Sequence, residues 1–365
     1  MADETTRPRP LTRRGFLKAG VVAGGLALTG VTTSQGRLNG VASLTDSSHG
    51  GHDGPTPIKN ESPTGGTQPH NQVGHDGHGV GQGTMGDVDL SLFDPTEFLY
   101  DFDWGRESKL ADGRTLREWD LFAGDKDIEV APGVMFPAWT FRAQVPGPTF
   151  RCHEGDLLRF NFLNGSAHDH TIHFHGIHPP SMDGVDPIVR SGQRFVYEFE
   201  ARPFGLHLYH CHVMPLKRHI HKGLYGAFII DPPGSRAPAR EMVMVMNAFD
   251  TNFDGANEVY AVNTVAFHYE RHPIQVKVGE LVRLYLVNLT EFDLINSFHL
   301  HAEMFRVYRT GTRLDHYEYT DTIMMCQGER HVLEFSLSYP GKYMFHAHQS
   351  EFAELGWSGF FEAVP

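Results

Sequence analysis

The sequence predicts an all-β protein made of two tandem antiparallel sandwiches or barrels of the Greek-key type. Short runs alternate apolar and polar residues, Gly, Pro and Asn separate these runs, and helical periodicity is scarce. The clearest runs are residues 157–162, 195–199, 275–287 and 331–337. The chain of 365 residues is long enough for two ordinary domains with extensions.

An internal repeat supports the tandem arrangement. Residues 205–212 match residues 341–348 at an offset of 136, and residues 170–175 match residues 296–301 at an offset of 126. A period of this length is one domain, so the repeat indicates two related domains rather than a solenoid. We therefore expect a leader at 1–46, a linker at 47–88, a first domain at 89–236 and a second domain at 237–365.

The N-terminal region predicts export. Residues 12–18 read Thr-Arg-Arg-Gly-Phe-Leu-Lys and precede an uncharged, mildly apolar stretch at 19–33. This pattern resembles a twin-arginine signal, which implies a periplasmic, cell-surface or extracellular protein, either released or anchored by its N-terminus.

Residues 47–88 are rich in Gly, Pro, Thr, Asp and His, which predicts a disordered linker. Two readings of its histidines stay open: a plain solvated spacer, or weak and exchangeable capture of copper. The histidines concerned are His49, His52, His70, His75 and His78.

Charge and cysteine content narrow the function. The formal net charge of −13 argues against nucleic acid and anionic membrane surfaces as partners. Only three cysteines occur, too few for a disulfide framework. Cys152 and Cys326 occupy comparable places in the two repeats, so a bridge and two buried thiols both remain possible.

Histidine is the outlier of the composition, with 24 residues. Four His-x-His pairs occur, and one of them encloses Cys211. Side chains alternate faces along a strand, so each pair should aim two imidazoles the same way and its middle residue the other way. The pairs are His173 and His175, His210 and His212, His299 and His301, and His346 and His348.

The same alternation predicts two different sites in the first repeat. Four imidazoles share one face, while His170 and Cys211 share the other with a further imidazole from His219 or His221. Two histidines and one thiolate are the ligand set of a blue-copper electron-transfer site. The second repeat has Asn296 and Ala347 at the corresponding positions and so lacks such a site.

One isolated His-x-His pair is more often an ordinary surface or hydrogen-bonded histidine pair than a metal site. Four pairs at repeat spacing favour a metal cluster. Zinc is the main rival to copper, but structural zinc sites prefer four ligands and have no use for eight imidazoles beside a His-Cys-His set.

In these residues and their spacing, the chain resembles a two-domain multicopper oxidase of the laccase-like type, with type 1 copper in its first domain, related to copper nitrite reductase and ceruloplasmin. The resemblance covers roughly residues 114–365 and implies two cupredoxin-like domains. It assigns His170, Cys211 and His219 to the type 1 copper. Residues 219–224 are similar to the ceruloplasmin run His-Ile-His-Ala-Gly-Met, which puts Leu224 at the axial position; Met214 is the nearby alternative.

The resemblance further implies four coppers per subunit: one type 1, one type 2 and two type 3. His173 and His299 would hold the type 2 copper. The type 3 pair would be held by His175, His210, His212, His301, His346 and His348. Asp183 resembles the family's acid near the type 2 copper, which orients water and passes protons; Glu351 and Glu354 are weaker candidates, and a plain turn aspartate is the other reading of Asp183.

The implied reaction is one-electron oxidation of a small reducing substrate coupled to reduction of dioxygen to water. Two-domain members of the family are trimers in which the first domain of one subunit meets the second domain of the next, so we expect a homotrimer. The reductant stays open among phenols, aromatic amines, cuprous ion and ferrous ion.

Two other functions remain alternatives. Copper nitrite reductase also joins two cupredoxin domains, but it needs three histidines at its type 2 site and a catalytic aspartate where this chain has His173. A non-enzymatic copper-binding or copper-storage protein would have no use for Cys211 between His210 and His212.

Overall fold

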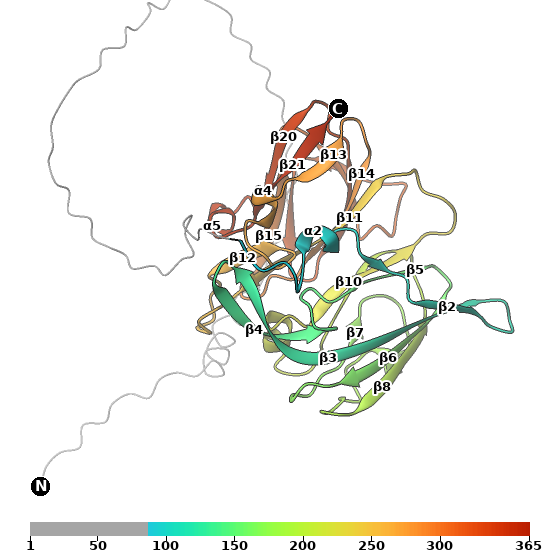
Figure 1. The fold of residues 1–365 in the computed structure, drawn as a ribbon. Helices are drawn as coiled ribbons and strands as arrows, with labels where there is room; N and C mark the ends of the chain where they lie inside the picture. Colours follow the sequence, from blue (N-terminus) through green and yellow to red (C-terminus); the bar gives the residue numbers. More distant parts are fainter. Residues whose placement is uncertain (1–86) are drawn as a thin grey trace, which may run out of the picture. The chain divides into compact units, whose positions relative to one another are not determined.

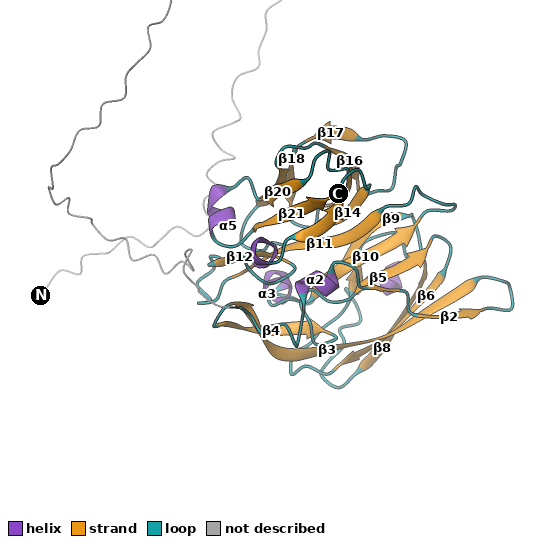
Figure 2. Cartoon of the chain, turned by 45° about the horizontal axis from the view of Figure 1, so that its top comes forward, coloured by secondary structure: helices purple, strands orange, loops and turns teal. Residues whose placement is uncertain are grey.

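The computed structural model describes residues 87–365. Strands dominate it and the helices are short (Figure 2), which confirms the predicted all-β class. The predicted export signal and all but the last residues of the predicted linker lie outside the described residues. No helix within residues 87–365 has the length and apolar character needed to cross a bilayer.

The first sandwich occupies the lower part of Figure 1 and consists of two sheets. One sheet runs β1 (Phe102–Asp103), β5 (Thr149–His153), β10 (Tyr225–Asp231), β9 (Gly205–His210) and β7 (His173–Phe174). The other runs β2 (Arg106–Lys109), β3 (Thr115–Ala131), β6 (Leu157–Asn164) and β8 (Arg194–Glu200), with β4 (Val134–Phe141) paired to β3.

The second sandwich, in the orange and red part of the chain, also has two sheets (Figure 1). One runs β12 (Val259–Val262), β11 (Arg240–Phe249), β14 (Val282–Asn288), β19 (Arg330–Phe335), β16 (Phe305–Arg309) and β17 (Glu318–Thr320). The other runs β13 (Ile274–Lys277), β21 (Ser358–Val364), β20 (Gly341–His346), β15 (Ile295–Leu300) and β18 (Thr322–Cys326).

The sheets are mixed, which differs from the antiparallel arrangement that we expected. Strand pairs β3–β6 and β5–β10 are parallel in the first sandwich, and β11–β14 and β13–β21 are parallel in the second. These pairs join strands that are distant in sequence. Alternation of apolar residues fixes which face of a strand is buried, but it carries no information on the direction of a distant partner.

Short helices and one N-terminal segment complete the fold. The helices are α2 (Pro95–Phe98), η1 (Pro180–Met182), α3 (Leu216–His221), α4 (His268–Arg271) and α5 (Ser350–Glu354). Asp94 caps α2 by accepting a hydrogen bond from the Thr96 backbone N–H at 2.7 Å, with Pro95 at the first helical position. The Tyr269 hydroxyl of the second sandwich donates to the Pro95 carbonyl at 2.7 Å, and the chain then enters the first sandwich as β1.

Three apolar clusters hold the molecule together: one core in each sandwich and one layer between them. The layer between the sandwiches joins Leu206 and Leu208 of β9 to Val243 and Val245 of β11, all fully buried. Burial on both faces explains why β9 has no exposed residue. The strand that ends at His210 is thereby fixed between the two domains.

A buried ion network also crosses from one sandwich to the other. Arg151 on β5 makes two hydrogen bonds to Asp231, at 2.8 and 2.9 Å, and one to Glu241 on β11, at 2.7 Å. Glu241 also accepts from Arg283 at 2.8 Å and from the Tyr285 hydroxyl at 2.9 Å. Removing Glu241 would leave two nearly buried guanidinium groups without their shared carboxylate.

We expect Glu241→Ala to lower the free energy of unfolding by about 1.5–3 kcal/mol, because Arg151 and Arg283 keep Asp231 and Glu334 but each loses its second carboxylate partner. Glu318→Ala is the matched control, since Glu318 and Arg309 are half-exposed and such pairs contribute about 1 kcal/mol or less. Urea unfolding of both variants measures the difference. Equal losses in the two variants would show that the network does not stabilise the contact between the sandwiches.

The structure excludes both arrangements of Cys152 and Cys326 that the sequence left open, a disulfide and two buried thiols. All three are free, Cys152 and Cys211 are buried, and Cys326 is exposed at the end of β18. A Cys152–Cys326 bridge is therefore excluded, and so is the alternative of two buried thiols.

Candidate metal centre

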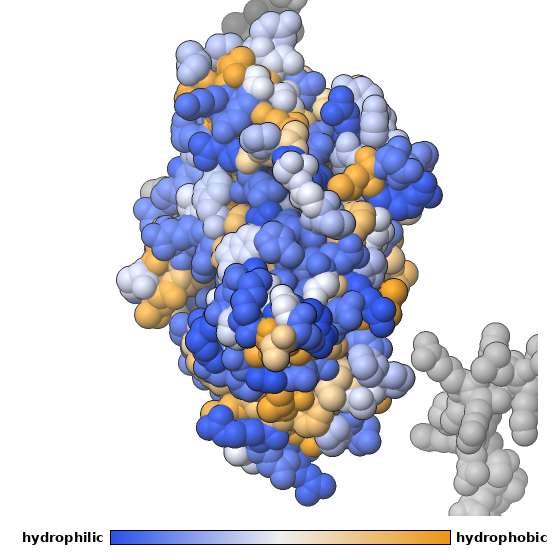
Figure 3. All heavy atoms as spheres, turned by 90° about the vertical axis from the view of Figure 1, so that its right-hand side faces the viewer, coloured by the Kyte–Doolittle hydropathy of each residue, from blue (hydrophilic) through white to orange (hydrophobic). Residues whose placement is uncertain are grey.

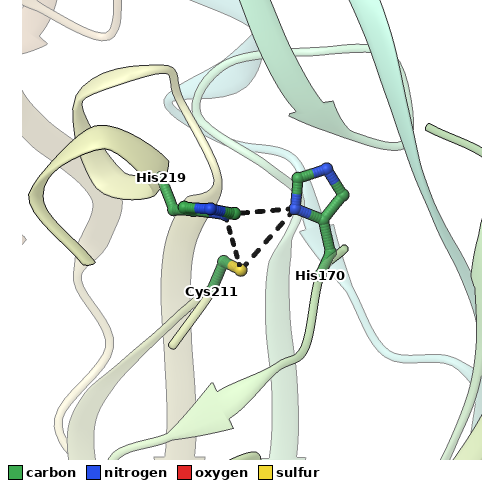
Figure 4. Close-up of side chains that lie close together, drawn as sticks. All are labelled: His170, Cys211 and His219. Atoms are coloured by element: carbon green, nitrogen blue, oxygen red, sulfur yellow. Dashed lines mark hydrogen bonds between the residues drawn. The ribbon is translucent and has the colours of Figure 1, made fainter. Parts of the chain in front are cut away.

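One candidate site gathers His170, Cys211 and His219 inside the first sandwich (Figure 4). The two Nδ1 atoms lie 3.2 Å apart, and the Cys211 Sγ lies 3.2 Å from His219 Nδ1 and 3.7 Å from His170 Nδ1. The three residues come from distant parts of the chain: the segment before β7, the residue after β9, and α3. The three donor atoms converge as one ligand set.

Burial sets the electrostatics of this thiolate site, by which we mean His170, Cys211 and His219. It lowers the pKa of His170 to about 3 and that of His219 to about 4, so both imidazoles are neutral and offer lone pairs. Burial raises the pKa of Cys211 to about 11, although the Thr171 N–H donates to its sulfur at 3.4 Å. A thiolate here requires a bound cation, and two neutral imidazoles with one thiolate suit copper.

The structure distinguishes between the paired alternatives at this site. His221 faces away, because its Nε2 accepts a hydrogen bond from the Asp250 N–H at 3.0 Å. Leu224 is fully buried in the same apolar cluster as Cys211, and its carbonyl accepts from the Cys211 N–H at 2.9 Å. Met214 is 74% exposed. His219 and Leu224 therefore occupy the neighbourhood of the sulfur.

A second group in the first sandwich contains His173, His175, His210 and His212, here called the first imidazole set. His173 and His210 are directly paired across β7 and β9. The Nε2 atoms of His175 and His210 lie 3.2 Å apart, and the rings of His173 and His212 have centroids 5.2 Å apart. The alternation of faces continues past the last residue of β9, because Cys211 is buried against the thiolate site while its neighbours join this set.

The second sandwich repeats the arrangement with His299, His301, His346 and His348, the second imidazole set. His299 and His346 are paired across β15 and β20, as His173 and His210 are in the first sandwich. The Nε2 atoms of His301 and His346 lie 2.9 Å apart, and the His299 and His348 rings have centroids 5.3 Å apart. Ala347 fills the position of Cys211 and is fully buried.

Backbone carbonyls orient the rings within each set. The Nδ1 atoms of His173 and His299 lie 2.8 and 2.9 Å from the carbonyls of Asp183 and Asp321. His210 Nδ1 makes the same kind of contact with the carbonyl of Cys211 at 2.8 Å. An Nδ1–H that donates to a carbonyl leaves Nε2 as the lone-pair atom, which is the arrangement of a metal-ligating histidine.

The two imidazole sets do not form one group within the chain. Among residues 87–365, no grouping of metal-capable side chains combines members of both sets. Their surroundings differ as well: His210 is buried, whereas His301 and His348 are exposed. The second set lies open on the surface of the single chain.

The predicted acids have different placements. Asp183 follows η1, and its carboxylate lies 3.1 Å from His173 Nδ1 and 3.9 Å from His178 Nε2. Glu351 and Glu354 are exposed on α5, just past His348, and belong to no such group.

Sequence reasoning missed two residues of the neighbourhood. His178 lies with His173 and Asp183, and its position three residues after His175 was the available signal. Trp139 packs on both imidazoles of the thiolate site, with ring centroids 5.3 Å from His170 and 4.9 Å from His219. Nothing in its local sequence marks it, because it reaches the site through the β3–β4 pairing.

Comparisons with known proteins agree with this geometry. Two family models, both described as multicopper oxidase, match residues 123–235 and 236–365. A crystal structure of a multicopper oxidase is 56% identical over 74% of this chain and 97% of that chain, with a TM-score of 0.73. A copper nitrite reductase from Nitrosomonas europaea is 26% identical over 68% of this chain and 94% of that chain, with a TM-score of 0.64.

Among curated proteins, the copper-containing nitrite reductase of Neisseria gonorrhoeae is 29% identical over 245 residues. The alignment covers 61% of this chain and 62% of that protein, so the chain matches less than two thirds of its relative's length.

Proposed function

This chain belongs to the multicopper oxidase family, and on that premise we propose that it is a laccase-like oxidase that couples oxidation of a small reducing substrate to reduction of dioxygen to water. Membership makes it a copper-dependent oxidoreductase. The observation that carries the finer proposal is the second imidazole set. Each of its four imidazoles corresponds to one in the first set, but the second sandwich has Ala347 in place of Cys211. This duplication of imidazoles suits a shared cluster of eight histidines.

We propose that His170, Cys211 and His219 hold a type 1 copper, and that the two imidazole sets hold one type 2 and two type 3 coppers. Copper bound at these residues would supply one-electron redox chemistry at the thiolate site and four-electron reduction of dioxygen at the imidazole sets. Cys211 is bonded through the backbone to His210 and His212, so one residue joins the thiolate site to the first imidazole set. Its burial keeps water from the sulfur.

Asp183 supports the same proposal. Its backbone carbonyl and its carboxylate both lie within hydrogen-bond reach of His173 Nδ1, at 2.8 and 3.1 Å. The side chain of Asp183 is 36% exposed, so it reaches solvent as well as the ring. We propose that it holds the His173 proton at Nδ1 and relays protons inward from water.

We further propose that the complete cluster forms between copies of the chain. Exposed apolar residues follow each imidazole set in sequence: Ile177, Val185 and Ile188 lie between the two histidine pairs of the first set, and Met304 lies three positions past His301. A contact between the first sandwich of one copy and the second sandwich of the next is head-to-tail and closes into a ring. The expected homotrimer would bring the exposed His301 and His348 against a first set.

Nitrite reduction is the second candidate, because curated relatives carry that name. His173 and His212 both belong to the first imidazole set, which has four rings. They favour the oxidase, because copper nitrite reductase needs only three histidines at its type 2 site. We expect the copper-loaded protein to consume about one dioxygen per four electrons taken from a phenol or an aromatic amine. Formation of nitric oxide from nitrite without oxygen uptake would instead support the reductase.

The axial position gives a further prediction. Leu224 has no donor atom, so a copper held by His170, Cys211 and His219 would have three protein ligands and a high reduction potential. Leu224→Met should add a weak thioether ligand and lower the potential by more than about 59 mV, a tenfold change for a one-electron couple. Redox titration of the blue absorption measures it. Leu208→Met, also buried but in the layer between the sandwiches, is the control; equal potentials in both variants would place Leu224 away from the copper.

A further inference from the structure

A cleft of about 640 Å³ opens beside α3, the helix that carries His219. Its walls come from α3, from the residues just past β11, and from Phe292. Its lining includes three cations, two aromatic rings and an acid: Lys217, Arg218, Lys222, Phe253, Phe292 and Asp254. The face of the molecule in Figure 3 is mostly hydrophilic with separate apolar patches. The cleft beside α3 combines cations with aromatic rings.

The cations on α3 are matched to aromatic rings rather than to acids. Lys217 Nζ lies 4.0 Å from the centroid of Phe292. Lys222 is only 8% exposed, and its Nζ lies 4.9 Å from the centroid of Phe136 and 5.0 Å from that of Phe253. Within the described part of the chain, Lys217, Arg218 and Lys222 form no ion pair with a carboxylate. In a chain of net charge −13, such unpaired cations are conspicuous.

The acids of the cleft are engaged elsewhere. The Asp250 carboxylate accepts hydrogen bonds from the N–H groups of Asp254 and Gly255, at 3.1 and 2.8 Å. Asp254 accepts from the Ala256 N–H at 3.0 Å and is exposed. Both acids belong to the loop after β11. The α3 wall therefore carries three cations without a direct ion pair, and the nearby carboxylates of Asp125, Asp127 and Glu291 offset their charge only from a distance.

The same wall contacts the thiolate site through Trp139. The Arg218 guanidinium lies 5.1 Å and Lys222 Nζ 5.9 Å from the Trp139 ring centroid. Trp139 packs in turn on His170 and His219. A donor bound against α3 would lie next to the helix and the ring that surround the proposed electron-accepting copper.

We propose that this cleft binds an aromatic reductant bearing a carboxylate or a sulfonate, with its ring against Phe253 and Phe292 and its anionic group on Lys217 and Lys222. The proposal rests on the oxidase function and specifies the substrate class of that site. Each donor molecule gives up one electron, and a phenolic donor releases its hydroxyl proton to water. Four such electrons and four protons convert one dioxygen to two waters.

A binding measurement tests the cleft without turnover. Calorimetric titration of the copper-loaded protein with naphthalene-2-sulfonate, which is not oxidised, should give a Kd that rises with salt. Lys222→Met and Lys217→Gln should each weaken binding by about tenfold, because each removes a charge-assisted contact. Lys342→Gln is the matched control, since Lys342 also lies near an aromatic ring, Phe360, but in the second sandwich. Unchanged affinity in both cleft variants would overturn the proposal.

Steady-state kinetics then identify the donor. For Lys222→Met, we expect kcat/KM for 3,5-dimethoxy-4-hydroxybenzoate to fall about tenfold more than kcat/KM for neutral 2,6-dimethoxyphenol. Preference for ferrous ion or a cationic aromatic diamine, lost in Asp254→Asn, would overturn the proposal in favour of the acidic loop. Absence of oxygen uptake with every donor would refute the oxidase function, while the titration would still decide what the cleft binds.

Discussion

Two inactive variants of this chain should regain oxidase activity when they are assembled together. His173→Ala/His175→Ala removes part of the first imidazole set, and His299→Ala/His301→Ala removes part of the second. If each cluster joins the first set of one copy to the second set of the next, a mixed ring contains some junctions with both sets intact. For random one-to-one assembly, about a quarter of the junctions are intact, so about a quarter of wild-type oxygen uptake is expected.

The design separates assembly between copies from assembly within one chain. The variants are unfolded and refolded together, or produced in the same cell, and oxygen uptake is compared with that of each variant treated alone. Native mass spectrometry confirms that mixed oligomers formed. If verified mixed oligomers regain no oxygen uptake, no cluster spans two copies. That result would contradict the proposed assembly, which is based on the separation of the two imidazole sets within one chain.

The second large effect is expected at the sulfur. Cys211→Ser should abolish the intense blue absorption, remove about one copper per chain, and lower oxygen uptake by more than about 100-fold. Loss of an outer contact to a metal ligand already costs about 10–100-fold, and in the proposed site Cys211 is both a copper ligand and the covalent link to His210 and His212.

Cys326→Ser is the control, because Cys326 is an exposed free thiol far from the thiolate site in sequence. It should keep the colour and the activity. A Cys211→Ser protein that retained its blue absorption would show that the sulfur is no copper ligand. One that lost its colour but kept full oxygen uptake would show that electrons reach dioxygen by another path.

The sequence was sufficient where a local rule decides geometry. Strand alternation separated Cys211 from His210 and His212, and the repeat identified Ala347 as the residue that replaces the cysteine in the second domain. Both arguments need only residues a few positions apart, and they succeed because the alternation continues past the ends of β9 and β20.

Long-range packing limited the rest. Strand alternation left His219 and His221 open, and only the resemblance of residues 219–224 selected His219. The physical reason is a distant contact, because Asp250 of the second domain engages His221. Trp139 and Lys222 approach each other because β4 lies against the end of α3. There the backbone N–H of Trp139 donates to the backbone carbonyl of Lys222 at 2.7 Å. The Arg151–Glu241 contact joins residues 90 positions apart. No local pattern encodes such contacts.

Copper content measured together with native mass tests the central claim most directly. We predict an oligomer, expected to be a trimer, that holds four coppers per chain: one at Cys211 and three at each junction between copies. A protein with two coppers per chain, or a monomer that keeps four coppers and full oxygen uptake, would contradict this account.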